Sequence, residues 1–506
     1  MKGKKLYCCF VDYRKAFDSV NRGMLFYKLS QCGIDCKIMN IIRSMYVNVK
    51  SCVKYKSQLS EYFSCSQGLM QGESLSPILF SLYVNDFEME FIKNLCVPIE
   101  VRDIALFLIM YADDTVLFSD TAEGLQNMLN TLCSYTSKWK LNVNTEKTKI
   151  VVFRKGGKLK NCYTWCYDNV PLDVVDNFNY LGITFNFNGK FNKAQSILAM
   201  QCKKSMNVLF SKMKSLHLNV LTKLNLFDTY VSSIAYYSCE VWGSIPAKEL
   251  ESVHLNFCKK VLGVKKSTAS MMIYSELGRF PLELERTFRL VKYFFKLRNT
   301  DNCILRNIYS EMYAQCLLEP NCKCWLSTVR DILFSAGLGY VWYEDYVNEK
   351  LVLLQMRQRL KDIFIQNMYS FFNSSSKCRI YRYICHGSDL QLYLRKPIPD
   401  QYKQCISKFR LSSHKLEIER GRYFNIPECN RKCKLCSYRD VEDEYHFIFI
   451  CPVYEKLRKL YINKYYYEKP SMYKLLQLFS NTNASVICNF GKFLYKASKL
   501  KLEATT

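Results

Sequence analysis

The sequence lacks the features that would direct it into or across a membrane. Its first residues, Met-Lys-Gly-Lys-Lys, are basic, but they run into a strand-like segment without the small-residue cleavage site of a secretory signal. No apolar run is long and clean enough to span a bilayer, because the run at residues 104–118 contains Asp113 and Asp114. Internal repeats and long low-complexity linkers are also missing. We therefore expect an intracellular protein, nuclear or cytoplasmic, that has no membrane partner.

Acidic residues are scarce. The 506 residues include 72 Lys and Arg against 45 Asp and Glu, a formal charge of +27. This excess favours a polyanionic partner, most simply nucleic acid, with an anionic membrane surface as the alternative. Hydrophobic residues at 49% indicate packed domains, two to four for this length. Twenty-five cysteines without a secretory signal indicate a reducing compartment, where thiols stay free or bind metal.

The rest of the chain is organised around residues 106–118, Leu-Phe-Leu-Ile-Met-Tyr-Ala-Asp-Asp-Thr-Val-Leu-Phe. Short apolar runs on either side of Asp113 and Asp114 predict two buried strands joined by a tight turn. Two adjacent carboxylates in such a place repel each other, and a cation relieves the repulsion. Mg²⁺ prefers carboxylate oxygen together with substrate phosphate. The alternative is a solvated Asp-Asp hairpin turn.

Two further segments could contribute to the same site. Residues 6–11 predict a strand that ends at Asp12, so Asp12 could be a third converging acid or simply a surface residue at a strand end. Residues 67–77 form a loop that enters an apolar helix, and Gly68 and Gly72 would allow the backbone to approach a ligand closely.

Near the end of the chain, two cysteines at C-x-x-C spacing are followed by a histidine and a third cysteine. Three thiolates and an imidazole suit tetrahedral Zn²⁺. The histidine is one of only five in the sequence, which strengthens the pattern. The predicted ligands are Cys433, Cys436, His446 and Cys451, with Cys429 as a possible competitor.

Three segments together resemble the reverse transcriptases of non-long-terminal-repeat (LINE-like) retrotransposons. They are Phe-Val-Asp-Tyr-Arg-Lys-Ala-Phe-Asp at 10–18, Gln-Gly-Leu-Met-Gln-Gly-Glu-Ser-Leu-Ser-Pro at 67–77 and Tyr-Ala-Asp-Asp at 111–114, in the family's order. Residues 141–149 and 178–182 extend the similarity. Residues 237–243, 276–281 and the Cys/His cluster resemble downstream regions of such elements, less distinctively.

The resemblance implies an α+β fold with a right-hand polymerase palm, a helical thumb and a helix-rich C-terminal region with a zinc-knuckle-like module. The expected domains are the palm with partial fingers (1–155), a primer-grip hairpin region (156–190), a thumb-like region (191–300), a basic helix-rich linker (301–420) and the zinc-knuckle-like region (421–506). The family carries a fingers region upstream of the first acidic block, so the sequence resembles an N-terminally truncated fragment.

The resemblance also implies the chemistry: RNA-directed DNA polymerisation that extends a DNA primer or target DNA on an RNA template, with two Mg²⁺ ions and deoxynucleoside triphosphates. The alternative is an inactive retroelement remnant that only binds nucleic acid. The implied residues are Asp12, Asp113 and Asp114 as Mg²⁺ ligands, Lys147 as the proton donor to pyrophosphate (with Lys149 competing), Tyr13, Phe17, Gln71 and Gly72 at the nucleotide, and Tyr180, Leu181 and Gly182 in the primer grip.

Overall fold

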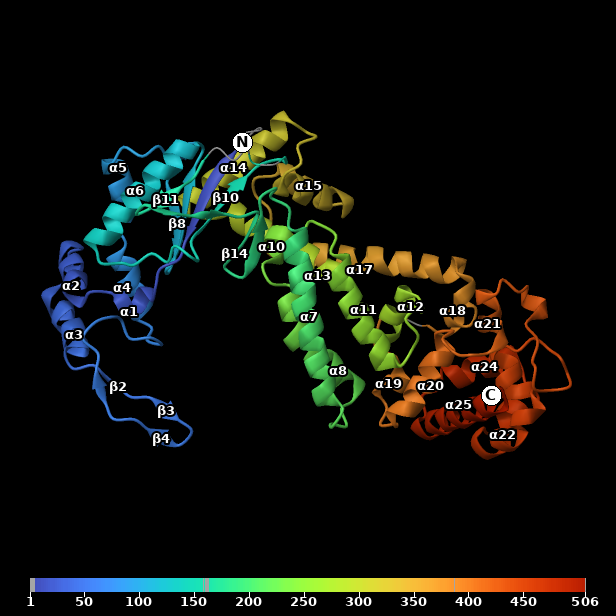
Figure 1. Cartoon of the computed structure of the whole chain (residues 1–506). Coiled ribbons are helices and arrows are strands. Elements are labelled where there is room, and N and C mark those ends of the chain that lie inside the picture. The colour runs from blue at the N-terminus through green and yellow to red at the C-terminus, as the bar shows by residue number, and fades with distance from the viewer. Residues whose placement is uncertain (1–4, 158, 160–162, 386, 506) are drawn as a thin grey trace. The chain divides into compact units, whose positions relative to one another are not determined.

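The computed structural model describes residues 5–157, 159, 163–385 and 387–505 (Figure 1). The chain divides into two compact units. Unit 1 comprises Met1–Ala194 with Thr300–Glu319, and unit 2 comprises Gln195–Asn299 with Pro320–Thr506. Each unit is treated by itself below.

Unit 1 is built on a five-stranded sheet in the order β13-β10-β1-β9-β8. The central strand β1 (Leu6–Val11) pairs antiparallel with both β10 (Lys149–Phe153) and β9 (Asp114–Ser119), and β9 pairs antiparallel with β8 (Leu108–Tyr111). Only β13 (Asp173–Val174) runs parallel to its neighbour. The strands predicted at 6–11 and on both sides of the Asp-Asp turn are thus confirmed.

Both faces of the sheet are covered, which explains why β1 is a continuous apolar run rather than an alternating one. Cys9 and Val11 face the larger core, which includes α2 (Arg22–Gln31), α4 (Ser76–Tyr83), α5 (Phe87–Lys93) and α6 (Ala122–Lys138). Cys8 and Phe10 face the other side, where residues of the hairpin β14 (Asn177–Tyr180) and β15 (Ile183–Asn186) pack against them.

The remaining elements of unit 1 surround this sheet. Arg102, which follows β6 (Ile99–Val101), binds α14 (Cys303–Leu318) through Glu311 at 3.2 Å. Short strand pairs link β2 (Lys50–Ser51) to β5 (Phe63–Ser64), β3 (Lys54–Tyr55) to β4 (Gln58–Leu59), β6 to β7 (Ile104–Leu106), and β11 (Cys166–Tyr167) to β12 (Val170–Pro171); α1 (Ala16–Ser19) and α3 (Cys36–Val47) complete the unit.

Unit 2 is helical, and its core contains a buried ion pair. Arg410 donates to Glu276 at 2.7 Å, and their side chains are only 2% and 0% exposed. Tyr393 also donates to Glu276 at 2.7 Å. The α-helices are α7 (Asn192–Met213, which begins in unit 1), α8 (Val220–Phe227), α9 (Ser233–Ala235), α10 (Cys239–Trp242), α11 (Lys248–Leu262), α12 (Ser270–Leu277), α13 (Leu282–Arg298), α15 (Trp325–Ser335), α16 (Tyr340–Tyr343), α17 (Glu349–Ser374), α18 (Tyr381–Ile384), α19 (Leu392–Arg395), α20 (Asp400–Arg410), α21 (Glu417–Tyr423), α22 (Glu455–Tyr461), α23 (Lys464–Tyr467), α24 (Met472–Phe479) and α25 (Ala484–Thr505).

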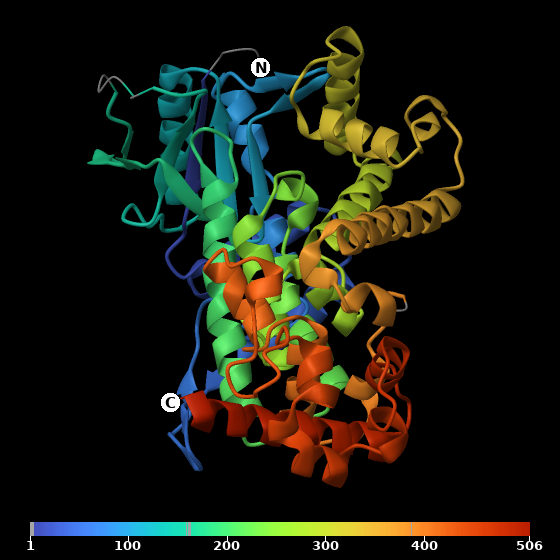
Figure 2. The same cartoon turned by 90° about the vertical axis from the view of Figure 1, so that its right-hand side faces the viewer.

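The last helix, α25, is the red helix beside the C label in Figure 2, and it packs along α20. The fold is therefore mixed α/β, with a mostly antiparallel sheet and many helices, in agreement with the expected class. In the described part of the chain, no helix combines the length and the apolar character needed to cross a membrane.

Candidate active site and metal centre

The three predicted acids meet at one end of the central strand pair. In the antiparallel ladder of β1 and β9, Val11 is opposite Thr115, so the next residues outward, Asp12 and Asp114, are neighbours. Asp113 lies in the two-residue turn between β8 and β9. The other turn residue, Ala112, has a φ of 54°, a conformation that costs a non-glycine residue about 1–2 kcal/mol. The turn thus has an unfavourable backbone conformation at Ala112, and it holds the carboxylates in place.

Negative charge accumulates where Asp12, Asp113 and Asp114 meet. The pKa of the Asp114 carboxyl is raised above its ordinary value, first by partial burial and then by the negative charges of Asp113 and Asp12. The three carboxylates do not form a set in which every ligand oxygen lies within 4.8 Å of the others. A group of like charges at one edge of a sheet favours divalent cations, which prefer such oxygens.

The backbone of Asp12 is held by two residues, Asn144 and Thr148, that the sequence analysis did not identify as site residues. The Asp12 backbone N–H donates to Oγ1 of Thr148 at 3.1 Å, and Asn144 N–H donates to the Asp12 carbonyl at 2.7 Å. Thr148 is fully buried. The polar segment 141–149 therefore fixes the backbone of the first acid, a role that its sequence does not reveal.

The segment 65–71 is docked on the chain that follows Asp12. Gly68 N–H donates to the Val20 carbonyl at 2.9 Å, and Leu69 N–H donates to the Phe17 carbonyl at 2.8 Å. Gly68 has a φ of +83°, and a Cβ at this position would lie 2.6 Å from the Asp18 carbonyl oxygen. Only glycine allows this approach, so Gly68 packs against protein backbone, where the sequence suggested a ligand.

Arg22 is the main side chain that binds the segment 65–71. Its guanidinium donates to the carbonyls of Gly68 at 2.9 Å, Tyr46 at 3.0 Å, Cys65 at 2.7 Å and Gln67 at 3.2 Å. The planar guanidinium suits several acceptors at once. No spacing in the sequence marks Arg22, because its partners are backbone atoms far along the chain.

The residues expected at the nucleotide take different positions. Phe17 is half-buried and stacks on Phe80, with ring centroids 4.9 Å apart. Gln71 is exposed and donates to Asp18 at 2.9 Å, and Gly72 is exposed with open space around its Cα. Tyr13 is only 7% exposed and packs in the core. A nucleotide contact from Tyr13 would have to come from its backbone.

Lys147 and Lys149 are the two candidates for the proton donor to pyrophosphate, and their surroundings differ. Lys149 donates to Asp173 at 2.6 Å. Lys147 is exposed and makes no ion pair with any residue that the structure describes. Of the two lysines, Lys147 is therefore the one whose ammonium group no carboxylate of the described residues engages.

The turn at 180–182 is brought near the acids. Leu181 and Gly182 both have positive φ, as a tight hairpin turn requires. Tyr180 packs against Phe10 of β1, with ring centroids 5.5 Å apart. Burial and then the charge of Asp114 raise the pKa of the Tyr180 hydroxyl. Its buried oxygen has no hydrogen-bond partner among the described residues.

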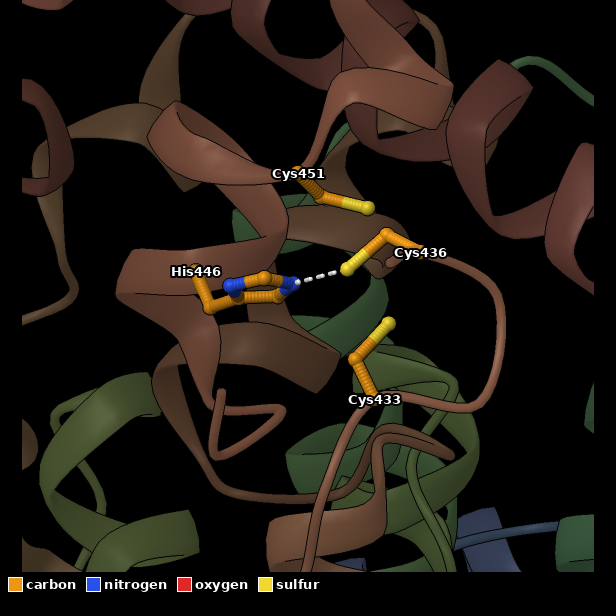
Figure 3. A group of neighbouring side chains, drawn as sticks. All are labelled: Cys433, Cys436, His446 and Cys451. Atoms are coloured by element: carbon orange, nitrogen blue, oxygen red, sulfur yellow. Dashed lines mark hydrogen bonds between the residues drawn. The ribbon is translucent and has the colours of Figure 1, made fainter. Parts of the chain in front are cut away.

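A second site lies in unit 2, where Cys433, Cys436, His446 and Cys451 converge (Figure 3). One ligand atom from each residue lies within 4.8 Å of the other three. Nε2 of His446 is 3.4 Å from the sulfur of Cys436. Cys433, His446 and Cys451 are buried. Cys429 is exposed and lies outside this group.

The donor set fits a thiophilic cation. Burial, followed by the neighbouring thiols, raises the pKa of the Cys451 thiol to about 12. Burial also lowers the pKa of His446, which keeps its imidazole neutral, the form that ligates metal. The other nitrogen, Nδ1, is 3.8 Å from Asp440, a common second partner for a ligating histidine. Three thiols and one neutral imidazole are a tetrahedral zinc set.

Comparison with known proteins finds similarity over part of the chain. Residues 1–185 match the family described as reverse transcriptase (RNA-dependent DNA polymerase). Over 255 residues the chain is 24% identical to a probable RNA-directed DNA polymerase from transposon X-element of Drosophila melanogaster, which covers 47% of this chain and 26% of that protein.

Two R2 proteins are also similar. A Pol polyprotein from a type-1 R2 retrotransposable element of Nasonia vitripennis is 26% identical over 197 residues, 37% of this chain and 19% of that protein. The Pol polyprotein of the type-2 element R2DM of Drosophila melanogaster is 28% identical over 206 residues, which are 38% of this chain and 19% of that protein. The aligned part thus spans 19% to 26% of the length of these relatives.

Proposed function

We propose that residues 1–185, which match the reverse transcriptase family, form a reverse transcriptase domain like those of non-long-terminal-repeat retrotransposons and that the chain polymerises DNA on an RNA template. The observation that carries the proposal is the meeting of Asp12 with the Asp113–Asp114 turn at one end of β1 and β9. On this proposal the sheet and its helices are the palm, and the helices after Ser196 act as a thumb.

We assign the acids to two Mg²⁺ ions, with Asp12 and Asp113 as main ligands and Asp114 as a weaker one. When bound, the ions would orient the primer 3′-hydroxyl and the triphosphate in line and neutralise charge that develops on the phosphate. The raised pKa of Asp114 and the donor set support this fit. The hydrogen bonds of Thr148 and Asn144 to the Asp12 backbone hold its carboxylate in a fixed position.

Residues around the acids would select and position the substrates. The Phe17 ring, backed by Phe80, would crowd a ribose 2′-hydroxyl and so favour deoxynucleotides. Gln71 and Gly72 would line the nucleotide pocket, and the backbone of Tyr13 would contribute beside them. Lys147 would give a proton to the departing pyrophosphate. The turn of Tyr180, Leu181 and Gly182 would hold the primer end next to Asp114, as the electrostatic coupling of Tyr180 to Asp114 supports.

The Cys/His cluster would hold a structural Zn²⁺, which stabilises the fold around residues 433–451 and helps the chain to bind RNA or target DNA. The formal charge of +27 supports a nucleic-acid partner, because Lys and Arg that contact phosphates release counterions.

Primer extension tests the polymerase. The chain is incubated with Mg²⁺, deoxynucleotides and a DNA primer on an RNA template, and Asp113→Asn is compared with Asp103→Asn, an exposed acid in the turn between β6 and β7. We expect Asp113→Asn to lower incorporation at least about a hundredfold, the scale of removing one electrostatic contact to a transition state. Asp103→Asn should extend normally. Tight RNA binding without any incorporation by the unmodified chain would instead favour the binding-only remnant.

Metal analysis tests the second site independently. The chain purified without chelator should carry one equivalent of zinc that Cys436→Ser loses, because a thiolate ligand is removed. Cys429→Ser, outside the cluster, should retain the metal. The zinc assignment would be withdrawn if the unmodified chain held no zinc, or if both variants bound it equally.

A further inference from the structure

A second cavity of about 580 Å³ lies wholly within unit 2. It is lined by α20, the segment 413–416, α21, α25 and the loop after α11. Its volume falls in the range of sites that hold one small ligand. Strand-binding grooves without sequence preference cover about 4–16 nucleotides, so this cavity suits a single unit rather than a continuous strand.

Five basic side chains line the cavity: Lys265, Lys408, Lys415, Arg420 and Lys501. No Asp or Glu is among the lining residues that the structure describes. Arg420 and Lys501 pair with carboxylates outside the lining, so the charges of Lys265, Lys408 and Lys415 make an anion the complementary ligand.

Acids outside the lining offset part of its positive charge. Glu442 binds Lys501, and Glu417 lies 3.5 Å from Arg420. Glu444 binds His414 at 3.0 Å and Arg379 at 2.7 Å. Lys408 and Lys415 have no ion pair with any residue in the described ranges. Their two charges are therefore available for a bound anion.

Two hydrogen bonds hold Lys265 in place. Its Nζ donates to the His414 carbonyl at 2.8 Å, and its backbone N–H donates to Oγ of Ser413 at 2.8 Å. An ammonium group has three donors, so two remain for a ligand after the bond to His414. A cation held in this way loses little freedom when it binds.

Apolar side chains also line the cavity, beside the polar Ser413, His414 and Ser498. Phe409, Leu416 and Phe447 are only 3%, 2% and 0% exposed and close the wall, so Leu502, at 44% exposure, offers the accessible apolar surface. A ligand that suits both parts has a strongly anionic group joined to a flat, weakly polar body. A phosphate can accept several charge-assisted hydrogen bonds, and a base can pack against apolar and aromatic side chains.

We propose that this cavity binds one nucleoside phosphate, either free or as the 5′-phosphorylated end of a nucleic-acid strand. The proposal goes beyond polymerisation, because none of the lining residues belongs to unit 1. Phosphate would lie among Lys265, Lys408 and Lys415, and the base against the apolar wall.

The test compares short RNAs that differ only in a 5′-phosphate or 5′-hydroxyl, by fluorescence anisotropy with the full chain and by competition with AMP. The double variant Lys408→Gln/Lys415→Gln is matched by Lys456→Gln/Lys469→Gln, two exposed lysines away from the cavity. We expect about tenfold preference for the 5′-phosphate, since two part-exposed charge contacts contribute about threefold each. The preference should vanish in the first variant and persist in the second.

Competition by AMP would support a free nucleotide as the ligand, and 5′-phosphate preference without AMP competition would support a strand end. Equal binding of both RNAs together with no binding of AMP would overturn the proposal. A preference that survives Lys408→Gln/Lys415→Gln would overturn it too, as would binding of an acidic peptide or a fatty acid in place of nucleotides. Asp113→Asn should lose primer extension and keep this binding, so the two proposals fail separately.

Discussion

Replacing Gly68 with alanine probes how the segment 65–71 is docked beside the acids. The added Cβ would lie 2.6 Å from the Asp18 carbonyl oxygen and 2.9 Å from the Asp18 Cα, both backbone atoms that cannot swing away. Gly33 offers a matched control, because its φ of +74° is similar and nothing lies within 4 Å of its added Cβ. Both variants are strained in the same way, and only Gly68→Ala also clashes.

The two costs can be separated. Alanine at such a φ costs about 1–2 kcal/mol, which both variants share. To relieve the clash, the segment at 68 must move away from residue 18, which weakens the bonds from Gly68 to Val20 at 2.9 Å and from Leu69 to Phe17 at 2.8 Å. Each backbone bond contributes about 1 kcal/mol net. Gly68→Ala should therefore lower the free energy of unfolding by about 3–4 kcal/mol, roughly 2 kcal/mol more than Gly33→Ala.

Urea denaturation of the full chain, followed by tryptophan fluorescence, measures this difference. Gly68→Ala should also raise KM for the incoming nucleotide, because Phe17 and Gln71 lie on the two segments that separate. Equal destabilisation by Gly68→Ala and Gly33→Ala would refute the argument that the backbone contact, rather than the φ alone, requires glycine at 68.

Two predictions concern unit 2. Arg410→Met should lower the free energy of unfolding by about 3–5 kcal/mol because it leaves the buried Glu276 charge unpaired. Adding Glu276→Gln should restore part of the loss. Urea denaturation would contradict this prediction if the double variant were less stable than Arg410→Met alone. Burial and then the charge of Arg279 lower the pKa of His254 to about 3, and its ring stacks on Phe227. Since the unfolded chain takes up this proton below pH 6.5 and the folded chain does not, stability should fall as pH drops from 6.5 toward 3, by about 2 kcal/mol at pH 5. His254→Phe should remove that slope and exposed His217→Gln should keep it; the reverse result would assign the effect elsewhere.

Much of unit 1 could be read from local pattern. The continuous apolar run before Asp12 and the paired runs around Asp113 and Asp114 predict three strands, and the structure has them as β1, β8 and β9. The Cys/His cluster was predicted in the same way, because C-x-x-C and a later His and Cys are close in sequence, and the structure brings its four members together. Signals of this kind are local, so they survive in a single sequence.

Other features depend on contacts between distant segments. The four carbonyls that bind Arg22 lie 24 to 46 residues away. Thr148 and Asp12 are 136 residues apart. Nothing in the spacing of such residues predicts their meeting, because an arginine at the start of a helix, or a threonine in a loop, has the same local pattern whatever it contacts. The buried position of Tyr13 and the pairing of Lys149 with Asp173 were hidden for the same reason.

The sequence by itself determined which residue types were available and where the short-range elements formed: the apolar strands, the Asp-Asp turn and the Cys/His set. Tertiary structure alone decided that Asp12 stands beside that turn, that Gly68 faces backbone instead of ligand, and that five cations from five parts of unit 2 line one cavity. The physical reason is that secondary structure follows from neighbours along the chain, whereas repulsion, close approach and charge complementarity depend on neighbours in space.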